Sequence, residues 1–144
     1  MTTTNDFAEL AQSGERATVL ESCFAAKLSA VAREEYGNNE RAASVLGVHT
    51  ITLSRWNTAG RGLPCSSLTP EVHGACARLA RALYNGPAHN QQADAIFSAF
   101  REGFARAALM QSGSQMKAAV RCHLHPKTFG FWMRSLKRGA QSQS

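Results

Sequence analysis

The chain has 144 residues and a formal net charge of +6, with 44% hydrophobic and only 8% aromatic residues. This length fits one domain, or two very small units that share a core, and it is short for an enzyme with a separate cofactor domain. No run of residues approaches the 18 or so consecutive apolar positions of a membrane-spanning helix. The N-terminus has neither the basic nor the apolar region of a secretory signal, so we expect a cytoplasmic protein with no membrane partner.

The sequence predicts helices throughout, because alanine is abundant and no stretch alternates between apolar and polar residues with the period of a strand. Asp6 is expected to cap a short first helix. Thr69 and Pro70 form a strong helix start, with a capping side chain followed by proline at the first helical position. In chain order, the predicted helices cover residues 6–11, 15–36, 40–46, 50–57, 69–83, 91–110, 115–122 and 126–137, with a loop at 59–67 and a disordered tail at 139–144. The predicted fold class is therefore all-α.

The sequence also contains an internal repeat with an offset of 76 residues. Both tryptophans of the chain fall on each other, and so do the positions that matter most for packing. The aligned pairs are Phe24 with Phe100, Leu28 with Phe104, Ala32 with Ala108, Gly37 with Gly113, Arg41 with Lys117, Ala42-Ala43 with Ala118-Ala119, Val48 with Leu124, His49 with His125, Thr52 with Thr128, Leu53 with Phe129 and Trp56 with Trp132.

Each copy has the pattern of a helix-turn-helix. In the first copy, the small side chains of Ala42 and Ala43 allow two helices to approach closely, and Gly47 supplies the left-handed backbone that the turn needs. Leu53 and Trp56 are expected to pack the second helix against the first and against the long helix before it. The predicted architecture is two tandem helix-turn-helix units packed on long helices.

The first copy resembles the DNA-binding region of the Fis family, which also ends many bacterial enhancer-binding activators. The resemblance lies in Gly37-Asn38, the basic Arg41 before Ala42-Ala43, the Leu46-Gly47 turn and Thr52-Leu53, and the second copy keeps its beginning from Gly113 to Ala119. The second copy departs from the pattern in three places. His123 replaces the turn glycine, Cys122 replaces Leu46, and Gly130 is expected to interrupt the second helix.

The resemblance implies that the second helix of each motif enters the major groove of DNA. Arg55 is suited to a guanine and Ile51 to a thymine methyl group. In the second copy the equivalent base-facing residues are His125, Lys127, Phe131 and Arg134, whereas Lys117, Arg121, Lys137 and Arg138 are suited to phosphates. The alternatives are that the charged residues are merely solvated, that the two histidines cap helices, and that Phe131 is a core or dimer contact. The predicted DNA contacts are Arg41, His49, Thr50, Ile51, Ser54 and Arg55 in the first copy, and Lys117, Arg121, His125, Lys127, Phe131, Arg134, Lys137 and Arg138 in the second.

The charge is distributed unevenly between the two halves of the chain. Residues 1–68 hold 6 basic and 7 acidic residues, whereas residues 69–144 hold 10 basic and 3 acidic residues. A polyanion is therefore expected to bind mainly through the second half. We expect the first copy to contribute more of the sequence selectivity and the second copy more of the phosphate binding.

The chemistry-bearing residues exclude several other classes of protein. The four cysteines have long, irregular spacing without a C-x-x-C, which favours buried thiols over disulfides in a cytosolic chain. The cluster Cys122-His123-Leu124-His125 lacks a second ligand pair at zinc-finger spacing. No phosphate-binding glycine loop, nucleophile elbow or H-E-x-x-H is present. We therefore expect no enzyme activity, no cofactor and no metal.

Together these patterns predict a nucleoid-associated transcription regulator of bacterial or phage type that binds double-stranded DNA sequence-specifically. One alternative is a DNA-packaging protein similar to phage small terminases. Another is a regulatory adaptor whose second repeat binds RNA polymerase or another regulator. The chain is expected to act either as a monomer with internal pseudo-symmetry or as a homodimer. The predicted organisation is an N-terminal helical unit at 1–62 with its motif at 37–57, a connector at 63–90, a C-terminal helical unit at 91–138 with its motif at 113–137, and the tail.

Overall fold

The computed structural model describes the backbone of residues 2–86 and 90–143, and the side chains of residues 3–86 and 90–134. Its elements are α1 (Thr2–Gln12), α2 (Ala17–Tyr36), α3 (Asn39–Leu46), α4 (Thr50–Arg61), the 3-10 turn η1 (Cys65–Ser67), α5 (Pro70–Asn85), α6 (Ala93–Ser112), α7 (Gln115–Arg121) and α8 (Pro126–Gln143). The described backbone contains no strand, so the all-α prediction is confirmed for it. None of its helices combines the length and apolar character needed to cross a membrane.

The ends of the helices follow local signals in the sequence. The Thr69 hydroxyl accepts a hydrogen bond from the Val72 backbone N–H at 3.2 Å, and Pro70 occupies the first turn of α5, as predicted. The long helices α2 and α6 both end at glycines in the left-handed conformation, Gly37 at φ 77° and Gly113 at φ 83°. These caps and stops place the helix boundaries close to the predicted ones.

Four predictions about the helices were wrong. Asp6 lies inside α1 rather than at its start, and its buried carboxylate accepts a hydrogen bond from Arg78 Nε at 2.8 Å. The helix α4 continues to Arg61, into the predicted loop. The helix α8 passes through Gly130 without interruption. Gly130 is buried, and a Cβ atom at this position would lie 3.1 Å from the side-chain nitrogen of Gln115, so the glycine leaves room for that side chain. The backbone of α8 also continues through the predicted tail as far as Gln143.

The internal repeat has a direct structural counterpart. The helices α2 and α6 begin and end at positions that are 76 residues apart, and α3 with α7 and α4 with α8 begin at the same offset. Asn38 and Ser114, which are equivalent, cap α3 and α7 by accepting hydrogen bonds from the Arg41 and Lys117 backbone N–H groups at 2.8 and 3.2 Å. The two copies therefore share one local design.

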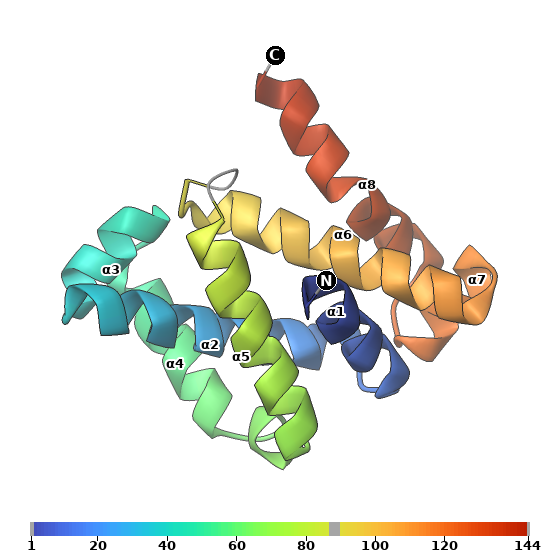
Figure 1. Cartoon of the computed structure of the whole chain (residues 1–144), viewed down its shortest axis with the longest axis horizontal. Coiled ribbons are helices and arrows are strands. Elements are labelled where there is room, and N and C mark those ends of the chain that lie inside the picture. Colours follow the sequence, from blue (N-terminus) through green and yellow to red (C-terminus); the bar gives the residue numbers. More distant parts are fainter. Residues whose placement is uncertain (1, 87–89, 144) are drawn as a thin grey trace.

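The molecule has a central group of helices with a helix pair at each end (Figure 1). The central group consists of α1, α2, α5 and α6. Within it α1 packs on α6, α5 packs on α2, and α1 and α5 contact each other. The pair α3–α4 lies at the end of α2, and the pair α7–α8 lies at the end of α6. The helix α5, predicted as a connector, is therefore part of the core.

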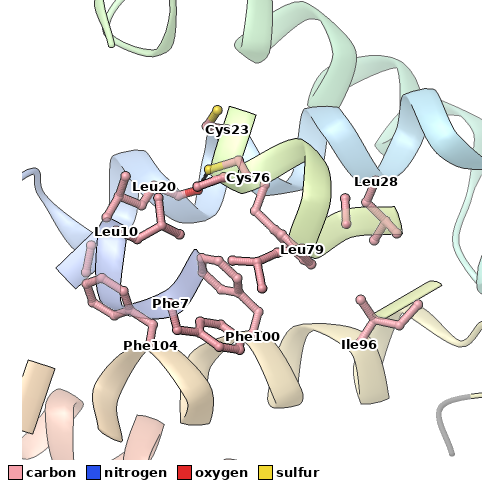
Figure 2. Close-up of a cluster of buried hydrophobic side chains, with 14 of the residues drawn as sticks. Phe7, Leu10, Leu20, Cys23, Leu28, Cys76, Leu79, Ile96, Phe100 and Phe104 are labelled. Atoms are coloured by element: carbon pink, nitrogen blue, oxygen red, sulfur yellow. Dashed lines mark hydrogen bonds between the residues drawn. The ribbon is translucent and has the colours of Figure 1, made fainter. Parts of the chain in front are cut away.

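Apolar side chains from all four central helices form the core (Figure 2). Phe24 of α2 stacks on Phe100 of α6 with ring centroids 4.3 Å apart, and Phe7 of α1 packs against the same Phe100 ring at 6.1 Å. Each fully buried aromatic ring contributes about 1.5–3 kcal/mol of hydrophobic stabilisation. All four cysteines are buried free thiols, as predicted.

Candidate nucleic-acid interface

The turn between α3 and α4 depends on a left-handed residue, as predicted. Gly47 has φ 75°, and the Ala43 carbonyl accepts the Val48 backbone N–H at 3.0 Å. Ala42 and Ala43 are buried, so the two helices approach closely at these small side chains. Leu53 on the inner face of α4 is fully buried. The orientation of α4 is therefore set by packing on its inner side.

The outer face of α4 is exposed and polar, with one apolar residue near its N-terminus. Thr50, Ile51, Ser54, Arg55 and Thr58 recur at the helical spacing, and Ile51 is 64% exposed. Together with Ala59, these residues line a shallow hollow of about 490 Å³.

Thr58 was missed from the sequence because α4 was predicted to end at Asn57. The helix extends further because Gly60 allows it to approach Ala26 of α2 more closely than a residue with a side chain would allow. That glycine was the available signal, and it was interpreted as part of a loop.

The turn between α7 and α8 keeps the same backbone without a glycine. His123 has φ 60°, and the Ala119 carbonyl accepts the Leu124 backbone N–H at 2.9 Å. A residue with a side chain in this conformation costs about 1–2 kcal/mol. Cys122 takes the place of Leu46 and is buried, and burial raises the pKa of its thiol. Cys122 faces the core while His123 and His125 are exposed, so these three residues, which are close in the sequence, do not face one common site.

The outer face of α8 carries more positive charge. Lys127, Phe131 and Arg134 are exposed, and the Arg134 guanidinium lies 5.8 Å from the centre of the Phe131 ring. His125 Nδ1 accepts the Lys127 backbone N–H at 3.1 Å, so this histidine caps its helix, whereas His49 forms no such bond in α4. The side chains of Lys137 and Arg138 lie outside the described residues.

The predicted DNA-contacting cations differ from the arginines of α5 and α6 in their pairing. In the described part of the chain, the five ion pairs all use arginines of α5 and α6, in the centre of the molecule. The cations of the two end pairs are exposed and form no ion pair with any described residue. These cations are Arg41, Arg55, Arg61, Lys117, Arg121, Lys127 and Arg134. Their charge is therefore available to an anionic ligand.

The helix pair of each copy is connected to the start of the long helix from the other copy. The Ala17 backbone N–H at the start of α2 donates to the Cys122 carbonyl at 3.0 Å. The Gln92 side chain at the start of α6 donates to the Val45 carbonyl at 3.1 Å. Both outer faces are thus positioned by the common core.

The predicted contacts form two surfaces rather than one. The helices α4 and α8, which carry these two surfaces, lie toward opposite ends of the molecule (Figure 1). Comparison of the chain with protein-family models, curated proteins and solved structures finds no match.

Proposed function

We propose that this protein is a sequence-specific, double-stranded-DNA-binding transcription regulator of bacterial or phage type. One observation supports this most strongly. The second helix of each end pair has an exposed, mainly polar face whose cations form no ion pair with a described residue, whereas the arginines in ion pairs belong to the central helices. Helices of this kind fit the major groove, where their outer residues reach base edges, and unpaired cations displace the counterions of the DNA backbone.

The residues of the two faces suit different parts of DNA recognition. Arg55 on α4 can form a bidentate pair with guanine, and the exposed Ile51 can contact a thymine methyl group. Lys127 and Arg134 occupy the positions on α8 that are equivalent to Ile51 and Thr58, where they suit the edges of other bases as well as phosphates, with Lys117 on the preceding helix adding a further phosphate contact.

The proposal is tested by selecting bound duplexes from a random pool and measuring affinity for the selected site at several salt concentrations. Arg55→Ala and Arg134→Ala should each weaken binding about 10- to 100-fold, the effect of losing one good base or charge contact. Arg81→Ala is the matched control, because Arg81 is exposed but pairs with Glu34 in the centre of the molecule, and it should leave binding unchanged. If neither Arg55→Ala nor Arg134→Ala weakens binding to any duplex, the proposal is wrong.

A second candidate function is that of an adaptor that binds a protein through α7. Met116 and Val120 lie one helical turn apart on α7 and are 61% and 68% exposed, whereas the equivalent residues of α3 are the polar Glu40 and Ser44. Lys117 adds positive charge beside this apolar pair. The partner that fits is therefore an amphipathic helix with apolar residues flanked by acidic ones.

This second candidate is tested with a synthetic leucine- and glutamate-faced helical peptide, and with the same peptide carrying lysine in place of glutamate. The acidic peptide should bind the native chain, and the basic peptide should not. Met116→Gln with Val120→Ser, which makes both positions polar without adding a charge beside Lys117, should abolish that binding and leave DNA affinity unchanged. Equal binding of both peptides, or binding that survives the double substitution, would contradict the adaptor function.

A further inference from the structure

Two copies of a motif in one chain can be related by a translation or by a two-fold rotation. Both arrangements give the same repeat in the sequence, but they differ in the relative direction of the two DNA half-sites that the copies would bind. Translation presents half-sites in the same direction, whereas a two-fold rotation presents them in opposite directions. The contacts between the two copies distinguish these arrangements.

The first contact is between equivalent residues. Phe24 and Phe100 are 76 positions apart, and their rings stack on each other with centroids 4.3 Å apart and planes 22° apart. A two-fold axis brings a residue against its own equivalent, as at the centre of a symmetric dimer. Under a translation, each residue would instead meet a different position of the next copy.

The second contact is reciprocal. The helix α1 of the first copy packs on α6 of the second, while α5, which precedes α6, packs on α2 of the first. The hydrogen bonds follow the same rule, because the start of α2 bonds to the Cys122 carbonyl and the start of α6 bonds to the Val45 carbonyl. Each copy thus contributes to the other the same elements that it receives.

An open pocket between the copies shows this relation for part of its lining. Its volume is about 250 Å³, and its lining includes Glu21, Ala25, Phe97 and Arg101. A shift of 76 residues converts Glu21 into Phe97 and Ala25 into Arg101, so these two pairs exchange, whereas Ser22, Trp56 and Ala59 of the same lining have no equivalent in it. Glu21 of α2 and Arg101 of α6 also form an ion pair between the two copies. The structure therefore corresponds to a symmetric dimer fused into one chain.

The two outer faces are nevertheless chemically different. At equivalent exposed positions, α4 presents Ile51, Arg55 and Thr58, whereas α8 presents Lys127, Phe131 and Arg134. We propose that one chain binds one duplex as a fused two-fold pair, and that its site consists of two half-sites that run in opposite directions, differ in sequence and have a fixed spacing. This inference rests on the proposed DNA-binding function.

The test compares the sites that two chains select from the same random duplex pool. The first is the native chain, and the second carries Lys127→Ile, Phe131→Arg and Arg134→Thr, so that α8 presents Ile, Arg and Thr at the positions equivalent to Ile51, Arg55 and Thr58 of α4. All three positions are exposed, so the core should be unchanged, which circular dichroism melting verifies. We expect the native chain to select a bipartite, non-palindromic site and the exchanged chain to select an inverted repeat of one half-site. Sedimentation should give one chain per duplex for both.

The outcomes separate the failure of this inference from the failure of the proposed function. A direct repeat selected by the exchanged chain, a single half-site, or two chains per duplex would each overturn the fused pair while leaving DNA binding intact. No enrichment by the native chain would overturn both proposals. If the exchanged chain does not fold, the reverse exchange on α4 (Ile51→Lys, Arg55→Phe and Thr58→Arg) provides the same comparison.

Discussion

Gly47 and His123 occupy equivalent positions in the two turns, and both have a left-handed backbone. At Gly47 the surroundings add a second constraint, because a Cβ atom would lie 2.7 Å from the Gln92 side-chain oxygen. Gln92 is the residue whose amide connects α6 to the Val45 carbonyl. The glycine therefore serves both the turn and the contact between the two copies.

Gly47→Ala should lower the free energy of unfolding by about 1–3 kcal/mol, because it adds backbone strain and displaces Gln92. Gly113→Ala is the matched control: its φ is similar at 83°, but no atom lies within 4 Å of the new Cβ. It should cost only about 1–2 kcal/mol from strain. His123→Gly should change stability by less than about 1 kcal/mol, because the relief of strain is offset by a more flexible unfolded chain. Urea unfolding measures all three, and equal losses for Gly47→Ala and Gly113→Ala would contradict a role for the Gln92 contact.

At the scale of helices, Gly103 determines how α1 packs on α6. A Cβ atom at this position would overlap the ring of Phe7, so the glycine leaves the space that the aromatic ring fills. The contact between Gly103 and Phe7 joins residues that are far apart in the sequence, and it holds α1 against the other copy.

Gly103→Ala should destabilise the protein by about 1–3 kcal/mol, the usual cost of overpacking a core, even though alanine favours helices. Gly74→Ala in α5 is the control, because its new Cβ would meet only the flexible end of the Arg78 side chain at 3.2 Å. It should be neutral or stabilise by up to about 1 kcal/mol. Thermal melts of both variants provide the measurement. Similar gains in both variants would show that α1 does not pack closely on α6.

The helices could be predicted well where local signals decide them, and poorly where distant partners do. Thr69 and Pro70 start α5 through their own chemistry, so the sequence was sufficient there. Asp6 looks like a helix cap, but its partner Arg78 lies in another helix. Gly130 looks like a helix breaker, but it makes room for Gln115. Tertiary contacts of this kind are not visible in local patterns.

At the scale of the whole molecule, the sequence predicted two motifs but not their relation. The described predicted contacts do lie on exposed surfaces at the two ends, because the inward and outward positions of a helix follow from its period. Their two-fold relation depends on contacts such as the Phe24–Phe100 stack, which a repeat in the sequence does not specify.

The shared core has a consequence for unfolding. Because α1 and α5 pack on the long helix of the opposite copy, neither copy retains a complete core without the other. The protein should therefore unfold in one cooperative transition rather than one copy at a time. The two tryptophans report on the two ends separately, since Trp56 lies on α4 and Trp132 on α8.

Trp132→Phe leaves Trp56 as the only tryptophan, and Trp56→Phe leaves Trp132. Within each variant, the urea transition followed by tryptophan fluorescence should coincide with the transition of helical content followed by circular dichroism, because the ends unfold with the core. The two variants can differ from each other in midpoint, since Trp132 is more deeply buried than Trp56, so the comparison is made within a variant. A fluorescence change that precedes the loss of helix in either variant would show that one copy unfolds independently. The fixed spacing between the two outer faces would then lose its structural basis.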